Sequence, residues 1–85
     1  MTHDEIVAAL VSYLMETNAL ARKRGPLPLD RSLHELGILD SSGILELVSF
    51  IEDHWSITIL DSELTNEMFG GLDKMANLIS HKLET

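Results

Sequence analysis

An acid and a hydroxyl stand side by side where a helix is predicted to begin, because Asp40 is followed directly by Ser41. The first N–H groups of a helix lack intrahelical partners, and with the helix dipole they favour a bound phosphate group. Ser41 would lie on a rigid element with its hydroxyl pointing off the helix end. Asp40 can accept a hydrogen bond from the same N–H groups and so cap the helix. Asp-Ser is a common capping pair in its own right, so the pair taken alone predicts a helix cap with an exposed hydroxyl beside it.

Other residues that could take part in catalysis or metal binding form weaker sequence patterns. Ser41, Asp40 and His34 are the residue types of a hydrolase triad, but the chain has no nucleophile-elbow pattern and is small for a substrate pocket. The segment Asp61-Ser62-Glu63 lacks the spacing and the glycine of a calcium loop. The chain has no Cys, so it has neither a thiol nucleophile nor a disulfide. No two histidines have the i, i+4 spacing of a helical metal site, so no metal is expected at His3, His34, His54 or His81.

The elements that position Ser41 can be read from hydrophobic periodicity and stop signals. A first helix is predicted from about Asp4 to Ala21, ending at Arg22-Lys23-Arg24 and Gly25-Pro26. A second is expected from Ser41 to Asp53 or His54. The long connection between them, from Gly25 to Asp40, is unusual in a small domain and often functional, with one helical turn expected at Leu33–Leu36. Later elements are a short helix capped by Asp61, a Gly70-Gly71 turn and a last helix from Leu72 to Leu83.

The fold class predicted is therefore all-α, a small four-helix bundle of three longer helices and one short helix. Ile57-Thr58-Ile59 alternates like a strand, but it has no predicted partner strands and is interpreted as an extended loop. Residues expected in the core are Ile44, Leu47, Val48, Ile51 and Trp55 of the second helix and Leu72, Met75, Ala76, Ile79 and Leu83 of the last helix. The residues expected to anchor the long connection are Leu27, Leu29, Leu33 and Leu36.

Composition limits the classes of partner. The 85 residues predict a single domain over 1–85, and 14 acidic against 6 basic residues give a net charge of −8. Nucleic acid is not expected as a partner of such an acidic chain, whereas partners with basic surfaces are favoured. The alternative is that the acidic residues only keep the protein soluble. No apolar segment approaches the ~20 residues needed to span a membrane, and no secretory signal is evident at the start. We expect a cytoplasmic monomer.

The stretch Glu35 to Val48, with Leu36-Gly37 before Asp40-Ser41 and Glu46-Leu47-Val48 after it, resembles the attachment site of acyl and peptidyl carrier proteins. The resemblance extends over nearly the whole chain, including the aromatic at Trp55 and the Ile57–Asp61 segment. It implies that Ser41 bears a covalent 4′-phosphopantetheine arm and that Asp40 helps a phosphopantetheinyl transferase to position a divalent metal and coenzyme A. It also implies a non-catalytic carrier, whose partners are that transferase, an acyl- or aminoacyl-loading ligase and downstream synthases or transferases.

The same resemblance implies that partner enzymes bind the second helix through Ser42, Leu45, Glu46 and Ser49. Family members commonly have Leu after the modified Ser, and Ser42-Gly43 here favours a freestanding, specialised carrier over generic fatty-acid synthesis. The usual Phe is Trp55, and the usual Pro before Asp61 is Leu60. The cargo stays open among fatty acyl, polyketide and amino acid units. Two other functions stay open as well: a helical adaptor with the carrier fold but no arm, and, with less support, a small hydrolase.

Overall fold

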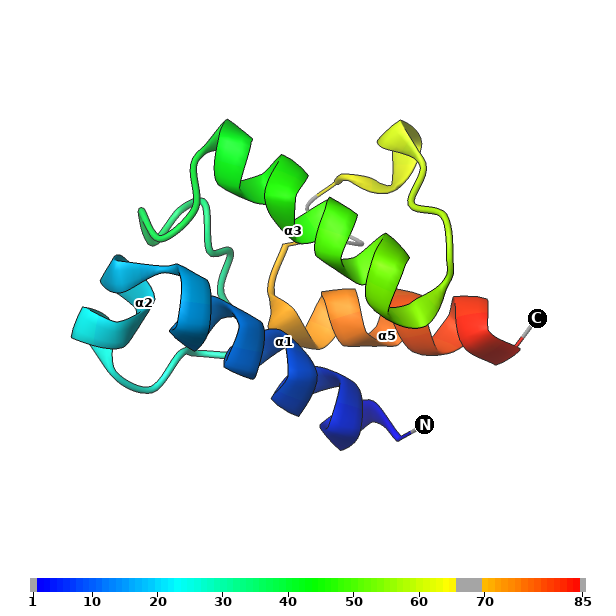
Figure 1. Cartoon of the computed structure of the whole chain (residues 1–85), viewed down its shortest axis with the longest axis horizontal. Helices are drawn as coiled ribbons and strands as arrows, with labels where there is room; N and C mark the ends of the chain where they lie inside the picture. The colour runs from blue at the N-terminus through cyan, green and yellow to red at the C-terminus, as the bar shows by residue number, and fades with distance from the viewer. Residues whose placement is uncertain (1, 66–69, 85) are drawn as a thin grey trace.

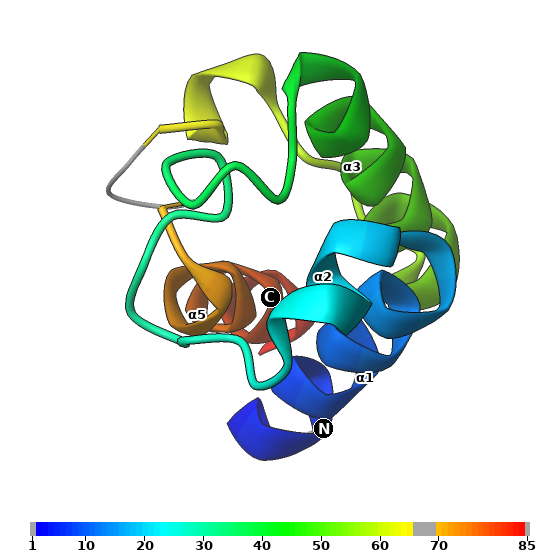
Figure 2. The same ribbon diagram turned by 90° about the vertical axis from the view of Figure 1, so that its left-hand side faces the viewer.

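The computed structural model describes residues 2–65 and 70–84, and this part of the chain is all-helical, with no strand. The elements in chain order are α1 (His3–Thr17), α2 (Ala19–Arg24), α3 (Ser41–Trp55), the 3-10 helix η1 (Asp61–Glu63) and α5 (Leu72–Glu84). Figure 1 shows α3 above α1 and α5, with α1 and α3 sloping in the same direction across the view. Figure 2 shows the long connection passing the end of α5 before it reaches α3. The predicted all-α helical bundle is confirmed at this level.

The first predicted helix is in fact two helices, so the expectation of one helix to Ala21 was wrong. Asn18 leaves the helical conformation, with φ −125° and ψ 112°. Its N–H still donates to the Leu14 carbonyl at 2.9 Å, while its side-chain oxygen accepts from Ala21 N–H at 3.0 Å and caps α2. Short amide side chains offer the backbone such an alternative to helical hydrogen bonds, which explains the break at this residue. Arg22 then folds back and donates to the α1 carbonyls of Met15 and Glu16.

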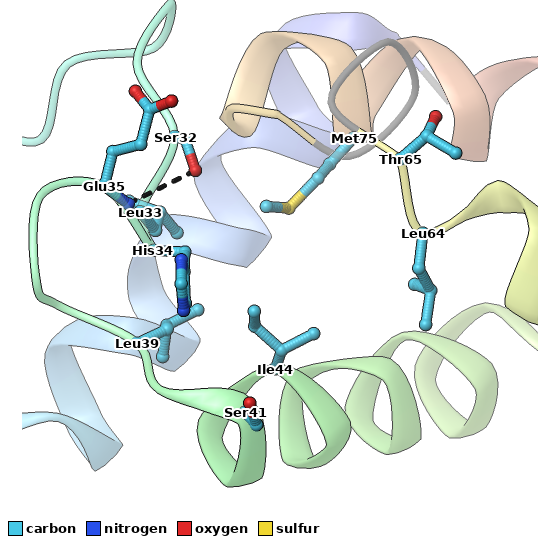
Figure 3. Close-up of a pocket in the computed structure, with 10 residues that line it drawn as sticks. All are labelled: Ser32, Leu33, His34, Glu35, Leu39, Ser41, Ile44, Leu64, Thr65 and Met75. Atoms are coloured by element: carbon cyan, nitrogen blue, oxygen red, sulfur yellow. Dashed lines mark hydrogen bonds between the residues drawn. The ribbon is translucent and has the colours of Figure 1, made fainter.

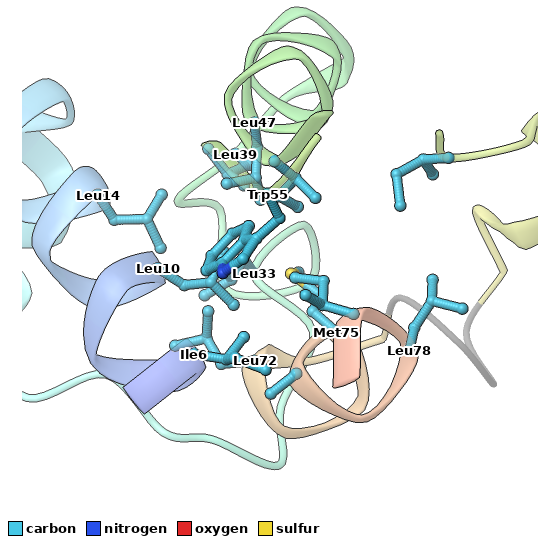
Figure 4. Close-up of a cluster of buried hydrophobic side chains, with 14 of the residues drawn as sticks. Ile6, Leu10, Leu14, Leu33, Leu39, Leu47, Trp55, Leu72, Met75 and Leu78 are labelled. Carbon is cyan, nitrogen blue, oxygen red and sulfur yellow. The ribbon is translucent and has the colours of Figure 1, made fainter. Parts of the chain in front are cut away.

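The hydrophobic core draws on every α-helix and on the long connection, and Figure 4 shows part of it around Trp55 and Met75. Leu83 was predicted to be in the core, but it is 38% exposed. It lies in the last turn of α5, which extends beyond α1 and α3 in Figure 1, and Leu78 is buried instead. The buried residues are Ile6, Leu10, Leu14, Ala21, Leu33, Ile38, Leu39, Leu47, Ile51, Trp55, Ile59, Leu72, Met75, Ala76, Leu78 and Ile79. Ile44 and Val48 are partly buried.

The long connection is fixed to α5 through its backbone as well as its side chains. Leu33 is buried and Leu27 and Leu36 are partly buried, but the expected anchor Leu29 has an exposed side chain. Its carbonyl instead accepts a hydrogen bond from Asp73 N–H at 2.9 Å. Gly71 allows this approach, since a Cβ there would lie 2.9 Å from the Leu29 carbonyl oxygen.

Two carboxylates order the segment after α3. Glu52 accepts from Ile59 N–H at 2.9 Å, and Ile59 is buried, as expected for an extended loop. Asp61 was predicted to cap the short helix, but it is the first residue of η1 and makes no capping bond. The Glu63 carboxylate accepts from Leu60 N–H at 2.7 Å and from the Lys82 ammonium at 2.8 Å. The pair with Lys82 therefore ties η1 to α5.

The burial difference along α3 gives a first testable prediction. Leu47 is fully buried, whereas Leu45, two residues earlier on the same helix, is 61% exposed. We expect Leu47→Ala to lower the free energy of unfolding by about 2–5 kcal/mol, because it removes buried methyl groups and leaves a cavity. The matched change Leu45→Ala should cost less than about 0.5 kcal/mol. Urea unfolding followed by circular dichroism measures both, and equal losses would contradict this packing of α3.

The Glu63–Lys82 pair predicts a pH dependence of stability. The hydrogen bond from Lys82, and next that from Leu60 N–H, lower the pKa of Glu63 below its ordinary value of 4.5. The pair therefore contributes stability above pH 4.5 and loses it as the pH falls through the lower folded-state pKa. We expect Glu63→Gln to lower the free energy of unfolding by about 1 kcal/mol at neutral pH. The difference should shrink below pH 4.5, and parallel stability curves for the unchanged protein and Glu63→Gln would argue against the pair.

Candidate functional site

Ser41 is the first residue of α3, and its side chain is exposed to solvent. Asp40 directly before it is the N-cap, and its Oδ1 accepts from Gly43 N–H at 2.8 Å. The predicted capping role of Asp40 is confirmed. The N–H groups of Ser41 and Ser42 precede the first intrahelical bond, which runs from Ile44 N–H to the Asp40 carbonyl at 2.9 Å. Within residues 2–65 and 70–84 these two donors have no acceptor, and they lie at the positive end of the helix dipole, where an anionic group is favoured.

The residues before Asp40 hold it in a defined place. Leu33 to Gly37 form a hydrogen-bonded turn without becoming a regular helix, and Gly37 takes a φ of +75° that favours glycine. The Leu33 carbonyl accepts from Ile38 N–H at 3.0 Å and from Leu39 N–H at 3.3 Å. Ile38 and Leu39 are both buried. Because the chain is anchored up to Leu39, the direction in which α3 begins is fixed, and so is the position of Ser41.

A long-range hydrogen bond adds to this support. The Asn18 amide nitrogen donates to the Ile38 carbonyl at 2.9 Å, across 20 residues of sequence. The residue that breaks the first helix therefore also holds the segment leading into Ser41. This positioning role was not predicted from the sequence, where Asn18 lay inside an expected helix. The only signal was an amide residue with low helix propensity inside that segment.

A pocket of about 310 Å³ opens beside Ser41. Figure 3 shows Ser41 at its edge, with the His34 ring, Ile44 and Met75 directed toward it. Its apolar walls come from three separate parts of the chain, the long connection, α3 and the segments around α5, so periodicity alone did not predict it. The lining residues are Ser32, Leu33, His34, Glu35, Leu39, Ser41, Ile44, Leu64, Thr65 and Met75. Ile44 was expected in the core, and it is only partly buried because it faces this opening.

The residues predicted to contact partner enzymes lie on one face of α3. The adjacent pair in the middle lies three or four residues from the residue on either side, so all share one side of the helix, and all are exposed: Ser42, Leu45, Glu46 and Ser49. The structure thus brings together, on α3, the predicted attachment residue and the predicted contact face. Asp53 continues the same face toward the C-terminal end of α3 and is also exposed.

The triad residues do not assemble into a hydrolase site. His34 and Ser41 line the same pocket, but Asp40 points its carboxylate at Gly43 N–H. Within residues 2–65 and 70–84, no hydrogen bond joins Ser41, His34 and Asp40 in the order a triad needs. The same ranges contain no group of three or more histidine and acidic side chains placed to hold a metal ion. No helix in them is both long enough and apolar enough to cross a membrane.

Comparison with known proteins shows no family for this chain. No protein-family model matches the sequence. No curated protein matches it closely enough to count as a relative.

The cap at Asp40 gives a prediction for the site itself. Asp40→Ala removes the acceptor for Gly43 N–H, and we expect the free energy of unfolding to fall by about 1 kcal/mol. Asp40→Asn keeps an oxygen at the same place, and asparagine caps helices as well as aspartate does, so this variant should stay within a few tenths of a kcal/mol. Denaturant unfolding measures both variants. Equal destabilisation would show that the charge of Asp40, not its hydrogen bond, stabilises α3.

Proposed function

We propose that this chain is a carrier protein that tethers an acyl or aminoacyl group as a thioester on a 4′-phosphopantetheine arm attached to Ser41. The observation that carries the proposal is the exposed Ser41 hydroxyl at a capped helix N-terminus, directly beside a 310 Å³ pocket. The order and lengths of the helices support a fold of the acyl-carrier type: long α1 and α3, the long connection between them, short η1 and long α5. The site residues of the sequence resemblance, Asp40 and Ser41, are the N-cap and the first residue of α3.

The residues around Ser41 fit a phosphodiester. The N–H groups of Ser41 and Ser42 and the dipole of α3 favour its negative charge, while Asp40, one residue away, is already engaged with Gly43 N–H. The hydroxyl is exposed, so a transferase can reach it. A phosphopantetheine group supplies a terminal thiol, which the chain itself lacks because it has no Cys. Asp40, through its second carboxylate oxygen, would help the transferase position its metal and coenzyme A.

The pocket and the exposed face of α3 would have separate roles: the pocket would hold the cargo, and the exposed face would bind partner enzymes. A volume of about 310 Å³ is at the small end for ligand sites and favours a compact acyl or aminoacyl unit over a long chain. Leu33, Leu39 and Met75 would exclude water from an apolar part of the cargo, and His34 and Ser32 line the same pocket with polar groups. Glu46, on the exposed face, would pair with Arg or Lys of partner enzymes. Exposed ion pairs contribute roughly 0–1 kcal/mol each, which suits contacts that must release quickly.

Intact mass spectrometry tests the proposal. After incubation with coenzyme A, magnesium and a broad-specificity phosphopantetheinyl transferase, we expect the protein to gain the mass of one phosphopantetheinyl group. Ser41→Ala should abolish the gain completely, while Ser42→Ala, its neighbour and also exposed, should retain it. Both serines lie in the first turn of α3, so the pair controls for the effect of replacing a hydroxyl there.

Two outcomes would contradict the carrier proposal. One is the absence of any mass gain in a sample whose helical circular dichroism shows it to be folded, which would favour the armless adaptor. The other is a gain that survives in Ser41→Ala and disappears in Ser42→Ala.

Asp40→Asn, which keeps the cap, should slow the transfer at least about tenfold if its carboxylate acts on the metal of the transferase.

A further inference from the structure

A groove lies next to the N-terminus of α3 and shares Leu39 with the pocket beside Ser41. It consists of two adjoining hollows of about 440 Å³ and 290 Å³, which share Leu20, Gly37 and Ile38. One end of this α2 groove is lined by Asp40 and Glu46 and the other by Lys23 and Arg24. It is therefore acidic next to the attachment site and basic at the far end, with Leu20 between the two.

The basic end is unusual in this chain. There are only six basic residues in a protein of net charge −8, and three of them are consecutive at Arg22–Arg24. The structure separates their roles: Arg22 donates to the carbonyls of Met15 and Glu16 at 2.9 and 3.1 Å and holds α2 against α1. Lys23 and Arg24 are exposed and line the groove, and neither forms an ion pair with any residue in 2–65 or 70–84. Their charge is therefore available to another molecule.

The apolar part of the groove points to the same use. Leu20 is 55% exposed, and it lines both hollows. The backbone that presents it is fixed, because Asn18 caps α2 and also donates to the Ile38 carbonyl on the opposite wall. A rigid recess that combines an exposed leucine with uncompensated charge at each end is suited to a protein surface of matching pattern.

We propose that the α2 groove binds a segment of a partner protein that presents an apolar side chain to Leu20 and carboxylates to Lys23 and Arg24. A basic residue of the same segment would face Glu46. Opposite charges at the two ends allow one direction of binding and disfavour the reverse, which would bring the partner to Ser41 in a single orientation. A membrane fits the groove less well, because the other charges of the chain would be repelled by anionic lipid. The inference rests on the carrier function for its purpose, since it identifies how enzymes of that pathway would be oriented.

The test uses isotope-labelled, unmodified protein and nuclear magnetic resonance. The probe is a synthetic amphipathic helical peptide with a leucine stripe, glutamates beside the stripe at one end and lysines at the other. We expect amide shifts centred on Leu20, Gly37 and Ile38, with a dissociation constant that rises with salt concentration. A peptide with every glutamate replaced by glutamine should bind at least about fivefold more weakly, as the loss of roughly 1 kcal/mol of charge interaction requires.

Matched variants make the result specific. Arg24→Glu and Arg31→Glu change the same charge at two exposed positions, but only Arg24 lines the groove. Leu20→Ala and Leu60→Ala remove the same side chain at two sites that are each 55% exposed. The Arg24 and Leu20 variants should each weaken binding by about fivefold, and the Arg31 and Leu60 variants by less than about twofold.

Three results would overturn the inference. The first is equal weakening by a groove variant and its control. The second is a set of groove shifts that depend on protein concentration without peptide, which would assign the surface to a second copy of this chain. The third is binding to phosphatidylglycerol vesicles that is lost in Arg24→Glu, which would assign it to a lipid surface. None of these measurements uses the arm, so failure of the groove and failure of loading at Ser41 give separate readouts.

Discussion

The geometry of the site depends on two hydrogen bonds that the side-chain amide of Asn18 makes. Its oxygen begins α2 and its nitrogen holds the Ile38 carbonyl, so a single residue joins the end of the first helical segment to the entry of α3. An amide is suited to this role because it offers a donor and an acceptor on one rigid group. Only one residue, the buried Leu39, lies between Ile38 and Asp40. The direction of α3, and with it the location of Ser41, is thus set by a contact 20 residues away in sequence.

The structure also distributes its acidic residues according to what surrounds them. Glu52 and Glu63 face inward along the segment after α3, where backbone N–H groups and Lys82 satisfy them. Glu46 and Asp53 face outward on α3 and have no such partners in the described part of the chain. Carboxylates that make specific hydrogen bonds contribute to the fold, whereas those on the open face repel one another and gain by meeting a basic surface. Some of the acidic residues behind the net charge of −8 therefore stabilise the fold, and others are available to bind a basic surface.

Local patterns predicted most of the helical elements, and non-local contacts account for most of what was missed. The cap at Asp40, the inward stripe of Leu47, Ile51 and Trp55 and the exposed Leu45 and Glu46 all follow from the 3.6-residue period and helix-end chemistry. The break at Asn18 did not follow, because the partner that stabilises it, Ile38, belongs to a distant loop. Leu29 illustrates the same limit. Its residue type predicted a buried side chain, but its backbone carbonyl makes the contact with α5. The pocket beside Ser41 needed the packing of separate segments and had no signature in any one of them.

The pocket beside Ser41 and the α2 groove both lie next to the start of α3. A carrier of the proposed kind would need two such recesses, one for its cargo and one for its partner. Leu39 lines both the pocket and the α2 groove, with Ser41 on one side of it and Asp40 and Ser42 on the other. Cargo in the pocket would be shielded by apolar walls, while a partner on the groove would read charge and Leu20 without entering the pocket. A ligand in either recess would press on the same buried Leu39 and on the capped first turn beside it. Because Leu39 is buried and lines both recesses, a change of its side chain is expected to alter the shape of the pocket and of the α2 groove together.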